Sequence, residues 1–513
     1  MQPRAFSRRQ LLLTIGQGSA ATAALSVLAA CGGAAASSAA VTAAQATSAA
    51  AGPATSAVAS TQAAATTAAA TTRIAATSAG PATASVAATA LPVAKGTPTL
   101  VYQTWWAEMM TNLKPLFPSF EQQFGAKLDV QVFAYNDWTA KLPVEFASNT
   151  PPDTMNANNF GHVKLFDQGV FLELGSRLKV DKIDLAHDYG LIGLESWCGK
   201  NYAMPFDNDP RQVYFNKTLI KAAGAKDPWD DLKGQWTLDD MAEIAVKTTK
   251  RGLDNKATQW GLQMGYTGMS ESNGMFVWTF GGQWADFQKM QFTLDSPESI
   301  AAHNYVLDLV RTKQCVLTTA DSDALTKAGV TDAFRAGKTA LYIRASANVE
   351  QNIKQMQGEF DWDIAPFPGR TQGVMGVPIV SGNPNEAAVA SKQPDLAYSF
   401  IKWLASTDVQ TYFAQNKVEV PSLNALKPKY GSNPPPAHIK VMSDTYNHPY
   451  GIHFRQYRTL DAYNEYAKEI APVFTGQATM ETTLRSLNKL LNDSFVQYGS
   501  CNPYAGMQVP IKP

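Results

Sequence analysis

The sequence predicts an α/β protein within residues 99–513, because short apolar strands alternate there with amphipathic helices. Residues 99–102 (TLVY) have the pattern of a strand, residues 113–124 that of a helix, and residues 128–132 (LDVQV) that of a second strand. The same segment holds all 11 tryptophans and all 6 histidines of the chain. It is too long for one ordinary hydrophobic core, so we expect two lobes.

Residues 1–30 have the features of an export signal. Twin arginines at positions 8–9 precede an apolar stretch of small residues, as in twin-arginine signal peptides. A transmembrane anchor is the alternative, but the Gly, Gln, Ser and Thr residues at 16–22 make the stretch less hydrophobic than a stable span. Residues 28–32 (LAACG) resemble a lipobox. We therefore expect Cys31 to be the lipidated N-terminus of an exported protein on the outer face of the cytoplasmic membrane.

Residues 31–98 are expected to be a linker after the lipidated cysteine. They consist almost wholly of Ala, Thr, Ser, Gly and Pro, and their only charged residues are Arg73 and Lys95. Without large apolar side chains, such a segment cannot offset the entropy lost on ordering. The sequence predicts a flexible stalk that O-glycosylation could modify. A long Ala-rich helix is the competing structure, which the Thr, Gly and Pro content disfavours.

Charge and cysteine content limit the classes of partner. Removal of residues 1–30 leaves 40 basic and 43 acidic residues, which gives no electrostatic basis for binding nucleic acid. No second segment is apolar enough to span a bilayer, so membrane attachment depends on the lipid alone. Cys198, Cys315 and Cys501 remain in a compartment that permits disulfides, and their pairing is open. They form no CxxC motif, so a structural zinc site is not expected. We also expect no other metal and no cofactor.

Three separated blocks resemble the family of extracellular solute-binding proteins that includes the maltose-binding protein. The first block comprises residues 151–155 (PPDTM) and 169–174 (GVFLEL). The second, more specific block comprises residues 202–207 (YAMPFD), 213–217 (VYFNK) and 236–241 (WTLDDM). The third comprises residues 333–341 (AFRAGKTAL), 360–369 (FDWDIAPFPG) and 397–404 (AYSFIKWL). Together the blocks cover most of the segment that is expected to fold.

This resemblance implies a type II periplasmic-binding-protein fold, with two α/β lobes joined by hinge strands around a central ligand cleft. The N-terminal lobe would comprise residues 99–211 and 376–435, and the C-terminal lobe residues 212–375 and 436–513. The resemblance further implies a monomeric, non-enzymatic subunit of an ABC importer. Such a subunit captures a carbohydrate by lobe closure and delivers it to the transmembrane permease subunits.

The chemistry of a sugar suggests which residues contact it. Hydroxyls at its rim suit Asp, Asn, Gln and Arg side chains, whereas its C–H faces suit aromatic rings. Clusters of such residues follow the first three expected strands, at the sheet edge where α/β proteins bind ligands. These candidates are Trp105, Trp106 and Glu108, then Asp137 and Trp138, then Asn158 and Asn159. A packed core position is the alternative for Trp105 and for Trp106.

The resemblance adds candidates beside the expected hinge. Asp207 matches an acid that is common in the clefts of the family, and Asn208 and Asp209 follow it. A solvated loop is the alternative. A calcium loop is excluded because Arg211 and Gln212 stand where an oxygen ligand and a glycine are required.

Further candidates lie in the C-terminal lobe. Residues 278–284 (WTFGGQW) resemble a family segment whose glycines let the backbone approach a ligand. Residues 344–348 (RASAN) replace the family's common GPW motif, so a sugar-stacking tryptophan is missing there. The candidates from these and one later region are Trp278, Gly281, Gly282, Arg344, Ser346, Arg455 and Tyr457.

Two other functions stay open at this point. The same fold could bind a polyamine, a peptide or a phosphorylated polyol, although few arginines are available to converge on a phosphate. A secreted glycoside hydrolase is less favoured, because the proximity of Asp207 and Asp209 in sequence does not establish the separation that two catalytic carboxylates need. The sequence also lacks HExxH, GxSxG and GxGxxG motifs.

Overall fold

The computed structural model describes residues 96–156, 163–166, 168–190, 196–269, 271–286, 288–356, 358–452 and 459–495. The contacts divide the chain after Thr89, and everything described lies in the second unit, Ala90–Pro513. The expected export signal, Cys31 and all of the expected linker up to residue 95 lie outside the described residues. So do Cys501 and the site candidates Asn158, Asn159, Arg455 and Tyr457.

The first lobe is built on a five-stranded sheet. Its strand order is β2-β1-β3-β15-β6, with β1 parallel to β2 and β3, and β15 antiparallel to both its neighbours. The strands are β1 (Thr99–Thr104), β2 (Lys127–Val132), β3 (Thr154–Asn156), β6 (Ala203–Met204) and β15 (Asn385–Ala387). The helices of this lobe include α2 (Ala107–Leu113), α3 (Phe117–Phe124), α4 (Tyr135–Ala147), α14 (Pro394–Leu404) and α15 (Thr407–Asn416).

Aromatic packing joins the early and late parts of the chain in this lobe. Phe400 of α14 lies 4.9 Å from Phe120 of α3 and 5.1 Å from Tyr102 of β1, measured between ring centroids. All three side chains are completely buried. Edge-to-face contacts of this kind add to the hydrophobic gain of burial, so α14 is an integral part of the N-terminal lobe, although nearly 300 residues separate it from β1.

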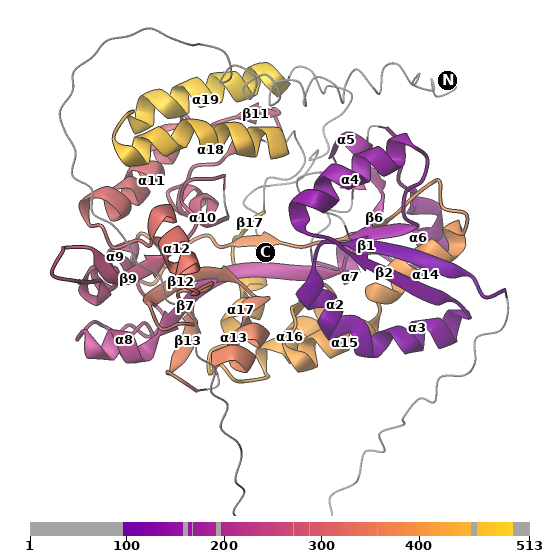
Figure 1. The fold of residues 1–513 in the computed structure, drawn as a ribbon, viewed down its shortest axis with the longest axis horizontal. Helices are drawn as coiled ribbons and strands as arrows, with labels where there is room; N and C mark the ends of the chain where they lie inside the picture. Colours follow the sequence, from indigo (N-terminus) through magenta and orange to yellow (C-terminus); the bar gives the residue numbers. More distant parts are fainter. Residues whose placement is uncertain are drawn as a thin grey trace, which may run out of the picture. The chain divides into compact units, whose positions relative to one another are not determined.

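The second lobe is built on a larger mixed sheet (Figure 1). Its strand order is β17-β14-β7-β12-β9-β8, and β13 and β16 also pair with β7. The strands are β7 (Asp207–Asn216), β8 (Lys250–Arg251), β9 (Ala257–Gln263), β12 (Thr339–Ala345), β13 (Trp362–Ala365), β14 (Ile379–Ser381), β16 (Val420–Pro421) and β17 (Gly451–Ile452). Its helices include α8 (Lys217–Ala222), α9 (Leu238–Thr248), α10 (Glu271–Thr279), α11 (Pro297–Leu307), α12 (Thr319–Lys327), α13 (Asn348–Met356), α18 (Thr459–Thr475) and α19 (Met480–Phe495).

Local sequence explains how α9 begins and packs. Thr237 Oγ1 accepts a hydrogen bond from the Asp240 backbone N–H at 3.1 Å, and Asp240 Oδ2 accepts one from the Thr237 N–H at 3.0 Å. This capping box satisfies two donors at the start of the helix. Gly261 of β9 then allows the strand to approach α9, because a Cβ there would lie 1.8 Å from the carbonyl oxygen of Ala245.

The long strand β7 links the two lobes. Its first half pairs with β16, which follows α15 of the first lobe, and with β14, with Val420 opposite Asn208 and Val380 opposite Pro210. Its second half pairs with β12 and β13 of the C-terminal sheet. The boundary that the sequence predicted between residues 211 and 212 therefore falls inside one continuous strand, which is the geometry of a hinge strand.

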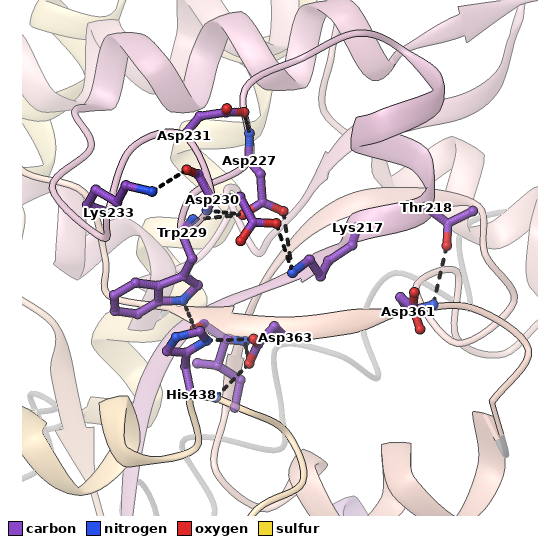
Figure 2. Close-up of polar contacts among 11 residues, drawn as sticks. Lys217, Thr218, Asp227, Trp229, Asp230, Asp231, Lys233, Asp361, Asp363 and His438 are labelled. Atoms are coloured by element: carbon purple, nitrogen blue, oxygen red, sulfur yellow. Dashed lines mark hydrogen bonds and ion pairs between the residues drawn. The ribbon is translucent and has the colours of Figure 1, made fainter.

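A cluster near the carboxyl end of β7 attaches a later segment of the chain to the C-terminal sheet (Figure 2). The His438 ring stacks on the Trp229 indole at 4.0 Å between centroids, and its Nδ1 lies 2.7 Å from Asp363 Oδ2. Asp363 Oδ1 also accepts a hydrogen bond from the His438 backbone N–H at 2.9 Å. Because Asp363 belongs to β13, these contacts attach the segment before α17 (Lys440–Asp444) to the C-terminal sheet.

The structure excludes one of the possible disulfide pairs. Cys198 is disulfide-bonded, whereas Cys315 is a buried free thiol and therefore not its partner. Burial raises the pKa of the Cys315 thiol to about 12, which keeps it protonated and unreactive.

Among the residues that the structure describes, no helix has the length and apolar character needed to cross a bilayer.

Candidate functional site

A cavity of about 370 Å³ opens at the carboxyl ends of β9 and β12. These two strands are parallel, with Leu341 opposite Leu262. Ligands of α/β proteins bind at this end of the sheet. The polar residues that line the cavity are Arg211, Gln263, Tyr266, Thr267, Ser272, Thr318, Thr319, Ser322, Asp323 and Arg344.

Hydrogen bonds and packing hold the cavity wall in place. Tyr266 follows β9 directly, and its hydroxyl accepts a hydrogen bond from the Thr319 backbone N–H at 3.2 Å. Its ring packs edge-on against Phe474 of α18 at 4.8 Å between centroids. Thr318 caps α12 through the Asp321 N–H at 3.1 Å. The tyrosine and the two threonines therefore line the cavity from fixed positions.

Two arginines line this cavity, Arg211 and Arg344. Arg211 lies on β7, where its Nη1 is 3.1 Å from Asp209 Oδ2 and donates a hydrogen bond to Ser381 Oγ at 2.6 Å. Arg344 lies near the end of β12, is exposed, and has its guanidinium 5.7 Å from the Tyr342 ring. The cavity thus offers guanidinium, hydroxyl, amide and carboxylate groups together.

Asp207, Asn208 and Asp209 are buried in the hinge and do not form a solvated loop. Asp207 is 3% exposed, and its two oxygens accept hydrogen bonds from the backbone N–H and the side-chain Nδ2 of Asn383 at 2.6 and 3.1 Å. Asn208 Nδ2 donates to the Pro421 carbonyl at 3.3 Å. These contacts give the acidic run a structural role, while a direct contact of Asp207 with a ligand stays a prediction.

The candidate tryptophans fall into two groups. Trp105 and Trp106, at the carboxyl end of β1, are half-buried and stack on each other with planes 3° apart and centroids 5.5 Å apart. Trp138 and Trp278 are buried in the largest hydrophobic core, and Trp278 packs so closely on Gly451 that a Cβ there would lie 2.5 Å from its indole. Both indoles therefore pack in the core, and a contact of either with a ligand stays a prediction.

The remaining described candidates are placed as follows. Glu108 and Asp137 are exposed near the helix ends that follow β1 and β2. Gly281 turns the chain after α10 with φ of 89°, and Gly282 is buried against Ser299 and Val277. Ser346 is buried in the hinge beside Asp209. Of all the described candidates, only Arg344 lines the cavity at β9 and β12, although Ser346 follows it by two residues.

A second cavity is less suited to a polar ligand. Its volume is about 220 Å³, and Trp229, Trp236 and Phe367 contribute to its lining. Both indole nitrogens already donate hydrogen bonds, to the carbonyl oxygens of Ile364 and Pro366 at 2.8 and 2.7 Å. We therefore take the cavity at β9 and β12 as the candidate site.

In the described part of the chain, no group of three His, Cys, Asp or Glu side chains is arranged to hold a metal ion.

Comparison with known proteins agrees with this architecture. Residues 103–411 match the sequence pattern of the bacterial extracellular solute-binding proteins. The chain belongs to this family. A binding protein of Brucella abortus (strain 2308) is 22% identical to this solute-binding protein over 337 residues, which are 61% of this chain and 74% of the relative. The predicted family membership is thus confirmed.

Solved structures of similar fold include several proteins whose ligands are sugars. An ABC substrate-binding protein from Listeria monocytogenes in complex with cycloalternan has a TM-score of 0.68, 20% identity, and covers 78% of this chain and 99% of its own. The GacH receptor of Streptomyces glaucescens, solved unliganded and with acarbose, has a TM-score of 0.66, 17% identity and the same coverage. MalE from Bdellovibrio bacteriovorus bound to maltotriose has a TM-score of 0.62, 16% identity, and covers 78% and 100%. The predicted two-lobed fold is confirmed.

Several residues of the site were not among the candidates derived from the sequence of this solute-binding protein. Gln263, Tyr266 and Thr267 end β9 or follow it directly, and Asp323 lies on α12. The rule that selected Trp105, namely polar and aromatic residues just after a strand, applies equally to Tyr266. No comparable pattern marks Asp323, because α12 reaches the cavity only through the folding of the chain.

Proposed function

We propose that the chain is the solute-capturing subunit of an ABC importer and that its solute is a carbohydrate. The observation that carries this proposal is the polar cavity at the carboxyl ends of β9 and β12, with Tyr266 and Arg344 in its lining. A sugar rim needs donors and acceptors side by side, and the threonine, serine and glutamine side chains there supply both. Neighbours of the same fold that were solved with sugars support this choice.

The half-buried pair Trp105 and Trp106 completes the proposed site from the N-terminal lobe. Their stacked rings present a flat apolar surface at the carboxyl end of β1. The C–H face of a sugar packs favourably on such a surface. We infer that the ligand touches this surface on one lobe and the cavity on the other, so it gains its full set of contacts only when the lobes approach each other.

An anionic solute, such as a phosphorylated polyol, is the second candidate. It is favoured because Arg211 and Arg344 both line the cavity. However, Asp209 pairs with Arg211 at 3.1 Å, and Asp323 lines the same cavity. These two acids leave little net positive charge for a phosphate, which needs several converging cations, so a neutral sugar fits better.

A thermal-shift screen against carbohydrates, polyamines, short peptides and phosphorylated polyols tests the proposal. A carbohydrate should raise the melting temperature, because binding to the folded state stabilises it by mass action. Arg344→Gln should then weaken the calorimetric affinity about tenfold, the effect of losing roughly 1.4 kcal/mol of hydrogen bonding. Arg370→Gln, an exposed arginine that does not line the cavity, is the matched control. A response to polyamines alone would overturn the carbohydrate assignment.

Lobe closure is measured by small-angle scattering with the ligand identified in the screen. The radius of gyration should fall at saturating ligand. A value that does not change would contradict closure even if a sugar binds.

The lipid anchor and the permease complete the proposed role. Lipid on Cys31 would hold the protein at the membrane surface, beside the permease that receives the solute. Detergent phase partitioning of cell fractions tests the anchor, because Cys31→Ala should move the protein to the aqueous phase. Unchanged partitioning would contradict lipidation. Loss of solute uptake when the chain is deleted, with the permease still present, tests the delivery.

A further inference from the structure

Glu419 is a completely buried carboxyl group in the hinge. It lies at the end of the segment after α15, immediately before β16, which pairs with β7 at Asn208 and Asp207. Its Oε2 accepts a hydrogen bond from the hydroxyl of Ser346, which follows β12. Its Oε1 has no hydrogen-bond partner among the described residues. One side-chain contact therefore joins a segment of the N-terminal lobe to the end of a strand of the C-terminal lobe.

The charged groups around Glu419 do not favour a third negative charge. Asp207 and Asp209 approach it from β7, and the cation that acts on it from the same strand, Arg211, is already paired with Asp209. Burial first, and then the charges of Asp209 and Asp207, raise the pKa of Glu419 well above its ordinary value of 4.5. If Glu419 were ionised, three buried carboxylates, including those of Asp207 and Asp209, would therefore share one cation, Arg211.

The other elements packed around this group place tyrosine hydroxyls beside it. The titratable hydroxyls of Tyr214 on β7, Tyr430 on α16 (Lys427–Gly431) and Tyr446 on η5 (Thr445–Asn447) interact electrostatically with Glu419. Burial raises the pKa of each, so all three stay neutral. Two basic groups lie behind these rings: Arg344 acts on Tyr214, and Lys427, whose pKa burial lowers to about 7, has its Nζ 3.9 Å from the Tyr446 ring centroid.

We propose that Glu419 is a proton-carrying hinge residue whose ionisation favours the open lobes, so that the affinity for the solute falls as pH rises. When Glu419 is protonated, it can donate to Ser346 Oγ, and the Ser346 hydroxyl is then available to Asp209 Oδ1, 3.3 Å away. When Glu419 is ionised, Ser346 donates to it, and Asp209 loses that donor. Closed lobes shield the hinge from water, whereas open lobes let water reach the new charge.

The effect of Glu419 on solute affinity rests on the proposed function. The protonation itself is a property of the unliganded chain. It can therefore be measured without knowing the solute, and a failure of the proposed function would leave that measurement intact.

Difference infrared spectroscopy of the full chain at pH 7 measures the protonation directly. The wild type should show the carbonyl stretching band of a protonated carboxyl, and Glu419→Gln should lack it. Glu359→Gln, an exposed glutamate, is the matched control and should keep the band. A wild-type spectrum that equals that of Glu419→Gln would overturn the proposal. Ser346→Ala is the second variant in case Glu419→Gln does not fold, and its band should shift because the hydrogen-bond partner is lost.

Calorimetry of the solute from the screen, at pH 5 to 9, measures the linkage. The wild-type affinity should fall by up to about tenfold per pH unit between the pKa of Glu419 in the open state and its higher pKa in the closed state, because closure takes up one proton in this range. The affinity of Glu419→Gln should be flat in comparison, while Glu359→Gln should follow the wild type. Parallel profiles for wild type and Glu419→Gln would overturn the coupling to closure.

Discussion

Asn383 binds both carboxylate oxygens of Asp207, through its backbone N–H at 2.6 Å and its side-chain Nδ2 at 3.1 Å. The pair connects the start of β7 with the loop between β14 and β15. Two charge-assisted hydrogen bonds to a buried carboxylate are worth more than neutral ones. Asp207 therefore contributes to the stability of the hinge, whatever its contact with a ligand.

Asp207→Ala should lower the free energy of unfolding by about 2 to 4 kcal/mol, because it leaves two buried donors of Asn383 without this acceptor. Urea denaturation followed by tryptophan fluorescence measures the change. Asp137→Ala is the control, since Asp137 is exposed and its loss should cost less than about 0.5 kcal/mol. Equal stability of the two variants would show that the contact between Asp207 and Asn383 is energetically neutral.

Trp278→Ala should mainly lower stability, whereas Trp106→Ala should mainly lower the affinity for a sugar. Trp278 is 3% exposed, so its truncation leaves a cavity and should cost about 3 to 5 kcal/mol of stability. Trp106 is half-buried, so its truncation should cost less stability but weaken sugar affinity about tenfold through the lost stacking surface. Denaturation and calorimetry on both variants separate the two roles. A strong loss of affinity in a stable Trp278→Ala protein would instead place this indole in the binding site.

Strand-end clusters and family motifs were sufficient to predict the two-lobed fold and to select Arg344, which lines the cavity, while a ligand contact of Trp105 and Trp106 stays a prediction. They could not distinguish Trp278 from a surface residue, because its burial depends on Gly451, which is 173 residues away in sequence. Nor could they reveal Glu419, whose environment is formed by strands that meet only in the folded chain.

Acid should destabilise the protein through His303. This side chain is fully buried, its Nδ1 is 2.7 Å from the Ser299 carbonyl, and its Nε2 is 2.7 Å from the Tyr466 hydroxyl. Burial lowers the pKa of His303 to about 4 from 6.5. The unfolded chain then binds more protons between these values, so about 3 kcal/mol of stability is present above pH 6.5 and is lost as the pH falls to 4.

Urea midpoints of wild type and His303→Gln between pH 4 and 8 measure this loss. The variant should have a flatter acid limb, whereas His448→Gln, at an exposed histidine, should retain the wild-type slope. Identical acid limbs for wild type and His303→Gln would rule out His303 as the cause.

Alkali should stabilise the protein through Lys427. Its Nζ donates to Asn424 Oδ1 at 2.6 Å and lies over the Tyr446 ring, but burial lowers the pKa of Lys427 to about 7. Between pH 7.5 and 9.5 the folded chain holds fewer protons than the unfolded chain, so stability should rise by about 1.4 kcal/mol per pH unit from this group. Lys427→Met should remove the rise, while Lys429→Met, an exposed lysine of the same helix, should keep it. A rise that persists in Lys427→Met would assign it to another group.

The position of β15 has a consequence for biosynthesis. This strand lies between β3 and β6 in the first sheet, yet the ribosome makes it about 180 residues after β6. Until then, β3 and β6 each lack a neighbour and present an unpaired edge to other nascent chains. The N-terminal lobe therefore cannot be completed during synthesis of its first half. Its maturation must wait until translation has passed residue 387, which favours folding after the chain is nearly whole over folding one lobe at a time.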